Sequence, residues 1–432
     1  MLPISRLSDL SEDEKLLLCN RYGADFSDVL INTVIPIVQD VQTNGDRAVL
    51  SYTKKFDGVT LDTVLCTPNE IESQAAKVDK FVISAFTKAY DNIHEFHSHQ
   101  RREDITYTRR DGSRLGMLYR PIERAAVYVP GGKASYPSSV LMGAVPARIA
   151  GVKTLTIVTP PDEDGMVPPG IAAVSTIAGV DTIIKSGGAH GIAAAGAGTQ
   201  TVSKSDLVVG PGNIYVTAAK TYLFSLGLIQ IDSMAGPSEV LIIADDSADP
   251  EWVAWDLLSQ AEHEERALAL LLTTSKTLAD EVNGHIQRDI DARRGRHDIK
   301  TAALKQCRTF LVDSIEEAVS FSNRYAPEHM QMMVTDPEHY LDVIQNVGSL
   351  FLGHYSPVAV GDFISGTNHI LPTGGAARFS SGLSVDTFMH RMTYQNVSPE
   401  ALKDYMPYTD IIAGVEGFDD KHGASIRKRF ER

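Results

Sequence analysis

The chain contains little cysteine, and its three cysteines are not arranged for a shared role. Cys19, Cys66 and Cys307 are far apart in the sequence and form no Cys-x-x-Cys motif. Such spacing excludes a zinc site built on thiolates and offers no framework of disulfides, which fits a reducing compartment.

Long apolar runs and an excess of basic residues are also missing. The densest apolar stretch, Ala267 to Leu272, is far shorter than a membrane span, and the first residues lack the pattern of a signal peptide. There are 55 acidic against 40 basic residues, and the net charge of −15 disfavours nucleic acid and anionic membranes as partners. We therefore expect a cytoplasmic protein that binds neither.

The dinucleotide fingerprint Gly-x-Gly-x-x-Gly is absent as well, but glycine follows several expected strands. Three such turns lie at residues 128–133, 186–191 and 210–213. Glycine lets backbone amides approach a phosphate at the carboxyl ends of parallel strands. A single turn of this kind is more often a tight connection, yet three in one module favour a nucleotide site without identifying the nucleotide.

The chain does have the length and patterning of a multidomain α/β protein. It has 432 residues and a mass of 47.0 kDa, which suggests two or more domains. Residues 11–100 are spaced as helices, and after Pro121 short apolar runs alternate with segments of helical length. The expected strands are residues 125–129, 154–158, 182–185, 207–209, 240–244, 268–273, 309–312, 331–334 and 350–352.

Strands that alternate with helices imply βαβ units and parallel sheets. Nine strands are many for one such sheet, and the pattern restarts after Gly236-Pro237. The sequence therefore predicts an α/β fold with two doubly wound, incompletely Rossmann-like modules and mostly parallel sheets, plus small helical elements at both ends. Residues 400–432 are expected to form a small tail outside both sheets.

One side of an expected helix carries side chains that could bind a metal ion. Asp249-Pro250 signals a helix start, and Asp256, Gln260 and His263 then follow at spacings of four and three. A polar stripe near a helix end is more often plain solvated surface. The metal interpretation therefore needs further ligands.

Asp362 and His422 are the further candidate ligands. Asp362 opens a polar, glycine-dotted loop to residue 382, and a loop of roughly twenty residues is usually functional. The alternative for Asp362 is an Asx-turn or cap after Gly361. Imidazole nitrogen with amide and carboxylate oxygen suits Zn²⁺ with an open position, and Mn²⁺ or Co²⁺ could substitute.

An adjacent acid and base stand in Ala326-Pro327-Glu328-His329. The proline is expected to mark a helix start, so Glu328 could simply complement the helix dipole. Equally, a carboxylate beside an imidazole can hold two protonation roles near neutral pH. The residues alone leave these two interpretations even.

Taken together, the motifs resemble the histidinol dehydrogenase family over nearly the whole chain. The matching stretches are Tyr128-Val-Pro-Gly-Gly, Gly210-Pro-Gly-Asn213, Ala235-Gly-Pro-Ser238-Glu-Val, Ser259-Gln-Ala-Glu-His263, Tyr325-Ala-Pro-Glu-His329 and Gly366-Thr-Asn-His-Ile-Leu-Pro-Thr373. This set, in this order, is far more specific than any one piece. The resemblance implies a zinc-requiring, NAD-dependent oxidation of L-histidinol through an aldehyde to L-histidine.

The resemblance also implies a role for each matching residue. One Zn²⁺ per subunit would be held by Gln260, His263, Asp362 and His422, and Glu328 would activate water while His329 accepts protons. The residues expected at NAD are Tyr128, His190 and Asn213. Those expected at the substrate are Ser238, Gln260, His263, His329, Asp362 and Glu416.

The family's architecture implies three parts and a homodimer whose tails are exchanged between subunits. A larger domain of residues 24–126 and 238–380 would carry the catalytic and metal residues, and residues 127–237 would bind the nucleotide. Residues 1–23 and 381–432 would form a small terminal element for dimerisation.

This sequence departs from the family pattern at three places. The family usually has a histidine five residues after the tail glutamate, where this chain has Lys421, with His422 one position later, so either the tail shifts by one residue or this ligand is lost. Val358 stands where a glutamate is common, and His190 stands where a glutamine often contacts NAD. These departures leave the reaction type intact but allow a paralogue that oxidises another small alcohol, such as a sulfonated propanediol.

Two other classes of function remain alternatives. A zinc hydrolase could use Glu328 as its base, and it would form no NADH with any alcohol. A catalytically silent nucleotide-binding relative would be favoured if the C-terminal site cannot hold metal. The dehydrogenase ranks ahead of both because the acid/base pair and the three upstream ligand candidates occur together.

Overall fold

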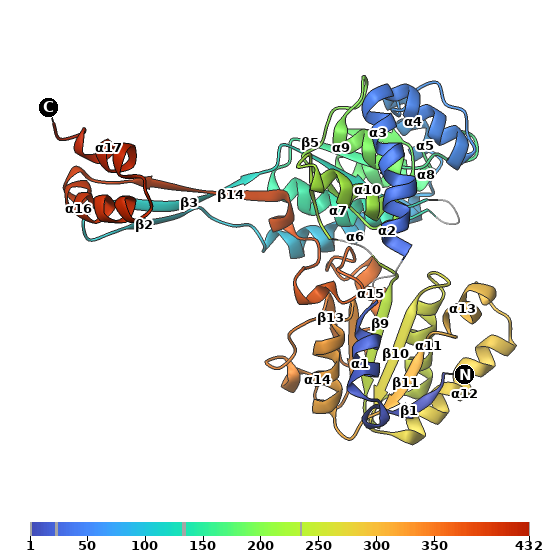
Figure 1. Ribbon diagram of the computed structural model, residues 1–432. Coiled ribbons are helices and arrows are strands. Elements are labelled where there is room, and N and C mark those ends of the chain that lie inside the picture. The colour runs from blue at the N-terminus through green and yellow to red at the C-terminus, as the bar shows by residue number, and fades with distance from the viewer. Residues whose placement is uncertain (1, 22–24, 132–134, 234–235, 432) are drawn as a thin grey trace. The chain divides into compact units, whose positions relative to one another are not determined.

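The computed structural model describes residues 2–21, 25–131, 135–233 and 236–431, and its contacts divide the chain into two compact units. The first unit comprises residues 1–100 and 122–388, and the second comprises residues 101–121 and 389–432. Figure 1 shows the elements of each unit. No helix among the described residues is both long and apolar enough to cross a membrane.

The first unit contains a six-stranded parallel sheet with the order β1-β11-β10-β9-β12-β13. Its strands are β1 (Ile4–Arg6), β9 (Glu239–Ala244), β10 (Leu268–Thr273), β11 (Arg308–Leu311), β12 (His329–Met333) and β13 (Ser349–Leu352). All six residues of β9 are buried, because both faces of a parallel sheet are covered by helices.

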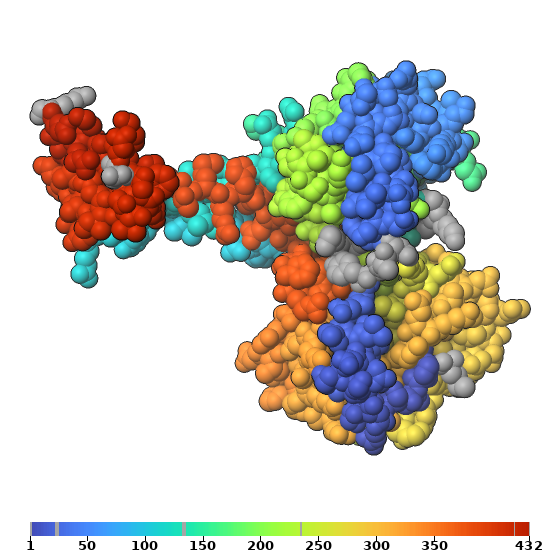
Figure 2. Space-filling view, viewed as in Figure 1, coloured from blue at the N-terminus to red at the C-terminus, as the bar shows by residue number. Residues whose placement is uncertain are grey.

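Helices cover each face of the six-stranded sheet. Val240 and Ile242 pack with α11 (Pro250–Ala261) and α12 (Lys276–Asp291), whereas Leu241 and Ile243 face α14 (Ile315–Tyr325). The alternation follows from the two-residue period of a strand. α13 (His297–Ala303) lies beside α11, and α1 (Glu12–Cys19) lies beside α14. Figure 2 shows the dark blue N-terminal segment on the surface of this module.

A second parallel sheet in the first unit has five strands in the order β6-β5-β4-β7-β8. They are β4 (Arg124–Tyr128), β5 (Thr154–Thr159), β6 (Thr182–Lys185), β7 (Leu207–Val209) and β8 (Gln230–Ile231). One face carries α7 (Pro137–Ala150) and α8 (Pro169–Ala178), and the other carries α9 (Gly188–Ala197) and α10 (Ile214–Ser225).

The N-terminal helices form outer layers on this second sheet. α3 (Ile35–Asn44) packs on α9, α5 (Pro68–Ala75) packs on α8, and α6 (Lys80–Ser98) packs on α7. The remaining short helices of this segment are α2 (Asp25–Val29) and α4 (Asp46–Tyr52), with π-helical turns at Leu30–Val34 and Thr53–Asp57. This module therefore has more than one helical layer on each side of its sheet.

The second unit is a three-stranded antiparallel sheet with short helices. Its strands are β2 (Ile105–Thr108), β3 (Arg114–Pro121) and β14 (Met389–Asn396), in the order β14-β3-β2. α16 (Pro399–Val415) and α17 (Ala424–Arg427) follow, separated by the π-helical turn Asp419–Gly423. The hydroxyl of Tyr405 on α16 donates to the Asp111 carboxylate and so ties the helix to the β2–β3 hairpin.

The predicted α/β class with mostly parallel sheets is confirmed, and all nine expected strands are present within one or two residues. The expected tail at residues 400–432 is helical. Five strands were not expected, namely β1, β2, β3, β8 and β14. Every residue of β2 is exposed, so this short strand contains no buried apolar run that would mark it in the sequence.

The structure divides the chain differently from the expected domains. Residues 24–126 were grouped with residues 238–380, but the helices α3, α5 and α6 pack on the five-stranded module. Residues 1–23 were expected in a terminal element, but β1 pairs with β11 in the six-stranded sheet. The second unit consists of residues 389–432 together with the hairpin of residues 101–121. Local patterning does not report which sheet a helix packs on.

Candidate active site

Glu328 and His329 lie at the start of a central strand and not at a helix start, as Pro327 had suggested. α14 ends at Tyr325, and Ala326 turns the chain with a φ of 52°. His329 is the first residue of β12 and pairs in register with Val240 of β9. Both side chains are buried, with 5% and 4% of their residue surfaces exposed. The helix-dipole interpretation of Glu328 is therefore wrong.

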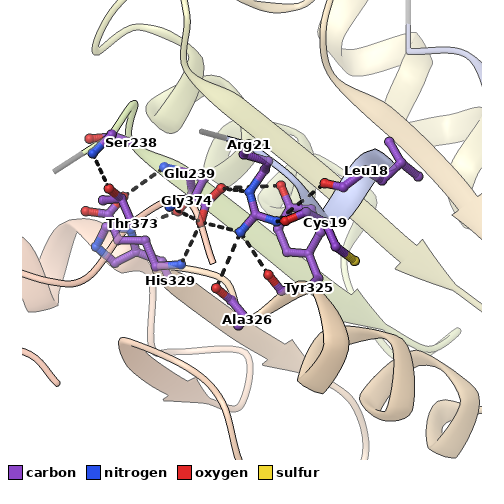
Figure 3. A network of polar contacts seen from close by, with 12 residues as sticks. Leu18, Cys19, Arg21, Ser238, Glu239, Tyr325, Ala326, His329, Thr373 and Gly374 are labelled. Atoms are coloured by element: carbon purple, nitrogen blue, oxygen red, sulfur yellow. Dashed lines mark hydrogen bonds and ion pairs between the residues drawn. The ribbon is translucent and has the colours of Figure 1, made fainter. Parts of the chain in front are cut away.

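Glu239, the first residue of β9, contacts both members of this pair through its backbone. Its N–H donates to Glu328 Oε2 over 2.8 Å, and its carbonyl accepts from His329 Nδ1 over 3.1 Å. Because a carbonyl can only accept, Nδ1 carries a proton and Nε2 remains the reactive nitrogen. Figure 3 shows Glu239 and His329 within this polar network.

Burial and neighbouring charges shift the proton affinities of the pair. Burial raises the pKa of Glu328, although the His329 imidazole opposes the shift. Burial alone would lower the pKa of His329, but the carboxylates of Glu328 and Asp362 outweigh it and raise the pKa. The pair therefore holds a proton strongly in the absence of a further cation.

Asp362 lies beside His329, at 3.5 Å from its Nε2. It is not the head of a loop or an Asx-turn, because it belongs to the short helix α15 (Val358–Phe363) and is buried. Its backbone carbonyl accepts from His369 Nδ1 over 2.8 Å, and His369 Nε2 lies 3.0 Å from Ser139 Oγ. Burial raises the pKa of Asp362, but the imidazoles of His329, His369 and His263 reverse this and lower it.

Gln260 lies in the last turn of α11, as expected, but the helix ends at Ala261, so His263 is not on it. Gln260 is buried, and its Nε2 has no hydrogen-bond partner among the described residues. His263 follows the helix end, is exposed, and is within electrostatic reach of Asp362 and His329. Neighbouring atoms partly desolvate its imidazole and lower the pKa of His263, which favours the neutral ring that a cation needs. Asp256, on the same side of the helix, instead accepts from the Gln331 amide over 2.8 Å.

These three side chains form a donor set that suits zinc. The imidazole of His263 is within electrostatic reach of the Asp362 carboxylate, and the buried amide of Gln260 lacks a partner among the described residues. Amide oxygen and nitrogen can be interchanged by rotation, so Gln260 can present its oxygen. No group of three His, Cys, Asp or Glu side chains within the described ranges is arranged as a metal site.

The expected cofactor residues lie at the carboxyl ends of the five-stranded sheet. Tyr128 ends β4, and its hydroxyl accepts from the Gly188 N–H over 3.2 Å. Asn213 caps α10 by accepting from the N–H groups of Tyr215 and Val216. Gly210 has a φ of +113°, and a Cβ there would overlap the Tyr128 carbonyl oxygen. Of the first glycine turn, Gly132 and Lys133 lie outside the described residues.

His190 is buried in the first turn of α9 and is paired with an acidic residue. Its Nε2 lies 3.4 Å from Asp57 Oδ2, and its ring contacts both Tyr52 and Phe56, whose rings stack on each other. Asp57 Oδ2 also accepts from the Gly187 N–H over 3.3 Å. Tyr52, Phe56 and Asp57 of the N-terminal segment therefore contact this glycine turn and its histidine.

The remaining expected residues fall in different places. Ser238 directly precedes β9, and its N–H donates to Glu264 Oε1 over 3.3 Å. Glu416 and His422 belong to the second unit, where Glu416 caps α16 and His422 lies in the turn Asp419–Gly423, with its ring centroid 5.3 Å from that of Phe418. Their parts in zinc and substrate binding stay predictions. Val358 is buried in the apolar core beside Phe351.

Two residues of the site were missed from the sequence: Arg21 and Glu239. The sequence did carry a signal for Glu239. It immediately precedes the continuous apolar run Val240–Ala244, and a charged residue at the start of a buried strand is unusual and needs a partner. Arg21 has no comparable signal. It lies 218 positions from Glu239 in the sequence, and only the fold brings them together.

Two parallel sheets, one with a buried carboxylate–imidazole couple and the other with glycine turns at its strand ends, are the architecture of an α/β enzyme. The chain matches the family model described as histidinol dehydrogenase over residues 20–430, and it belongs to the histidinol dehydrogenase family. It is an enzyme of the dehydrogenase class.

The similarity extends over the full chain in both sequence and structure. It is 47% identical over 397 residues to a histidinol dehydrogenase of Leptospira biflexa, which covers 92% of this chain and 91% of the relative. It is 43% identical over 430 residues to that of Methanocaldococcus jannaschii, covering 99% of each. The crystal structure of histidinol dehydrogenase from Elizabethkingia anophelis superposes with a TM-score of 0.93 at 37% identity, covering 100% of this chain and 98% of that one.

Proposed function

We propose that the protein oxidises L-histidinol through L-histidinal to L-histidine with two molecules of NAD. The observation that carries the proposal is the buried Glu328–His329 couple, fixed by Glu239 and facing Asp362. Family membership supports the substrate, and three buried free cysteines suit the reducing cytoplasm. Taking an alcohol to an acid removes two hydrides and adds the oxygen of one water.

The two halves of this oxidation make different demands on the couple. His329 Nε2 accepts the alcohol proton as the first hydride leaves, and Glu328 removes a proton from the water that hydrates the aldehyde. The backbone of Glu239 holds both groups in place during each half. Tyr128, His190 and Asn213 lie where a nicotinamide dinucleotide would be held, at the carboxyl ends of parallel strands.

Gln260, His263 and Asp362 would hold one Zn²⁺, with a fourth ligand from the tail. Bound zinc would hold the substrate's nitrogen atoms and take up the charge of Asp362, which lowers the proton affinity of His329. For the fourth ligand we propose His422 of a second subunit in a homodimer. The exposed apolar residues on and after α16, Tyr408, Ile411, Ile412, Val415 and Phe418, support an exchanged tail.

The test of the function is a substrate panel with coupled counting of NADH. L-Histidinol should give about two NADH per alcohol, and a chelator should stop the reaction. Turnover of a sulfonated propanediol in place of histidinol would establish the paralogue, for which the apolar burial of Val358 is the favouring observation. No NADH from any alcohol would overturn the dehydrogenase proposal and leave the hydrolase.

The tail is tested by metal content and by mixing subunits. His422→Ala should lower zinc content more than Lys421→Ala, and the reverse result would place Lys421 in the site. Mixed dimers of a Glu328→Gln chain and a His422→Ala chain should recover part of the activity, because one of their two sites has both residues intact. No recovery after verified mixing would mean that each site is built from one chain.

A further inference from the structure

Arg21, in the segment after α1, forms a buried ion pair with Glu239. Its Nε donates to Oε2 over 2.6 Å and its Nη2 donates to Oε1 over 2.8 Å. The two side chains are 7% and 1% exposed. This is the two-pronged geometry in which a planar guanidinium matches a carboxylate, and a lysine ammonium cannot reproduce it.

The same guanidinium also closes two helix ends. Nη1 donates to the carbonyls of Leu18 and Cys19 at the end of α1, and Nη2 donates to those of Tyr325 and Ala326 at the end of α14. Its central carbon, Cζ, lies 3.6 Å from the centroid of the Tyr325 ring. Helix C-termini leave carbonyls without partners, so one cation satisfies both ends and fixes the turn that leads into Glu328. Figure 3 shows these contacts converging on Arg21.

The Glu239 carboxylate, held by Arg21, in turn contacts the backbone of the Glu328–His329 couple. Oε1 accepts from the N–H of Glu328 over 3.3 Å and from the N–H of Gly374 over 3.2 Å, and Oε2 is 3.4 Å from the Tyr325 hydroxyl. The backbone of Glu239 itself binds the Glu328 carboxylate and His329 Nδ1. Glu239 therefore fixes the backbone of Glu328 with its side chain and the side chains of both catalytic residues with its backbone.

We propose that Arg21 and Glu239 are positioning residues for the Glu328–His329 couple. They hold the Glu328 carboxylate at its water and keep the proton of His329 on Nδ1, so that Nε2 faces the substrate. Neither side chain touches the reacting atoms. The proposal rests on the proposed function in one respect, namely that Glu328 and His329 perform the chemistry.

A misplacement of about 1 Å in a catalytic group can cost on the order of a hundredfold in rate. Arg21→Lys keeps the positive charge but cannot donate two parallel hydrogen bonds to the Glu239 carboxylate. Glu239→Gln keeps the shape of the side chain but loses its negative charge. We expect each to lower kcat for L-histidinol oxidation about 10- to 100-fold, while KM for histidinol and for NAD changes less than about threefold. Zinc content should stay unchanged, because neither residue contacts Gln260, His263 or Asp362.

Glu70→Gln is the matched control. Glu70 is also a buried carboxylate, since it accepts from the Lys185 ammonium over 2.8 Å and from the Val167 N–H over 2.9 Å. The Lys185 and Glu70 side chains are 6% and 8% exposed. Loss of its charge should destabilise the fold to a similar degree, measured by thermal unfolding, and leave kcat within about twofold of the original.

Chemical rescue separates positioning from stability. Arg21→Ala leaves space for a guanidinium ion, so added guanidinium at low millimolar concentration should raise kcat at least severalfold, whereas methylammonium should not. If Arg21→Ala does not fold, the comparison of Arg21→Lys and Glu239→Gln with Glu70→Gln decides alone. The proposal is overturned if the variants lose stability as Glu70→Gln does but keep kcat. An unsubstituted enzyme that does not oxidise histidinol would instead overturn the proposed function.

Discussion

In the two parallel sheets of the first unit, the candidate functional residues lie at opposite ends of the strands. We call the end where the strands finish the carboxyl edge and the end where they start the amino edge. In the five-stranded sheet, Tyr128 and the turn before Asn213 lie where strands end. In the six-stranded sheet, Glu239 and His329 are the first residues of their strands, and Gln260 lies at the end of a helix. Helices begin at the carboxyl edge of a parallel sheet and end at its amino edge.

This difference explains which charges each edge attracts. At the carboxyl edge, the free N–H groups of helix starts favour anions such as phosphates. At the amino edge, the free carbonyls of helix ends favour cations, and there the structure places the Arg21 guanidinium and the Asp362–His329 contact. The proposed dinucleotide and the proposed metal thus suit strand ends of opposite polarity.

The largest expected effect concerns the amino edge of the six-stranded sheet. His329→Ala should lower kcat about 10²- to 10⁴-fold, because it removes the general base. NAD affinity, measured by calorimetric titration of the enzyme, should change little, since the proposed NAD site belongs to the other sheet. A variant that keeps kcat within tenfold would assign the base elsewhere, and a parallel loss of NAD affinity would break the separation of the edges.

The second prediction concerns the carboxyl edge of the five-stranded sheet. Gly210→Ala introduces both a left-handed φ strain and an overlap with the Tyr128 carbonyl. Gly227→Ala is the control, because Gly227 has a φ of +68° but no atom within 4 Å of an added Cβ. We expect Gly210→Ala to lower the free energy of unfolding by about 1–3 kcal/mol more than Gly227→Ala, and to raise KM for NAD. Equal losses in denaturant unfolding would contradict the overlap.

The third prediction tests a contact between the helical layer of the five-stranded module and the loop after Asp362. His97 on α6 is fully buried, its Nε2 is 3.1 Å from the Asn368 amide, and burial lowers its pKa to about 4. The unfolded chain binds this proton below about pH 6.5, so stability should fall as the pH drops from about 6.5 to 4, by up to about 3 kcal/mol.

His97→Gln should remove most of that pH dependence, whatever it does to stability at neutral pH. His94→Gln, on the exposed side of the same helix, is the control. The measurement is urea unfolding at a series of pH values. An unchanged slope between pH 6.5 and 4 in His97→Gln would show that other groups govern acid unfolding.

The smallest expected effect concerns Tyr128. Burial raises its pKa to about 12, so the hydroxyl stays protonated and serves to hold the Gly188 N–H. Tyr128→Phe removes a neutral hydrogen bond worth about 0.5–1.5 kcal/mol, so KM for NAD should rise about two- to tenfold with kcat unchanged. A hundredfold fall in kcat would instead make Tyr128 part of the chemistry.

Much of the fold could be predicted because its signals are local. Continuous apolar runs such as Leu268–Thr273 predict buried strands, and Asp249-Pro250 and Asn213 mark helix starts that the structure has at those positions. The strand β14 was not predicted, because Met389–Asn396 is mostly exposed and polar and exists through its pairing with β3. Pro327 was misread as a helix start because proline fits a turn before a strand equally well.

The sequence by itself determined the nine strands with apolar runs, the helix starts at Pro250 and after Asn213, and the adjacency of Glu328 and His329, since each depends on residues that are near neighbours in the chain. Only the tertiary structure decided that Arg21 and Glu239, 218 positions apart, share one buried ion pair, and that His329 carries its proton on Nδ1. The physical reason is that a buried charge is stable only beside its partner. Which partner that is depends on how distant strands and helices meet, and no local pattern records it.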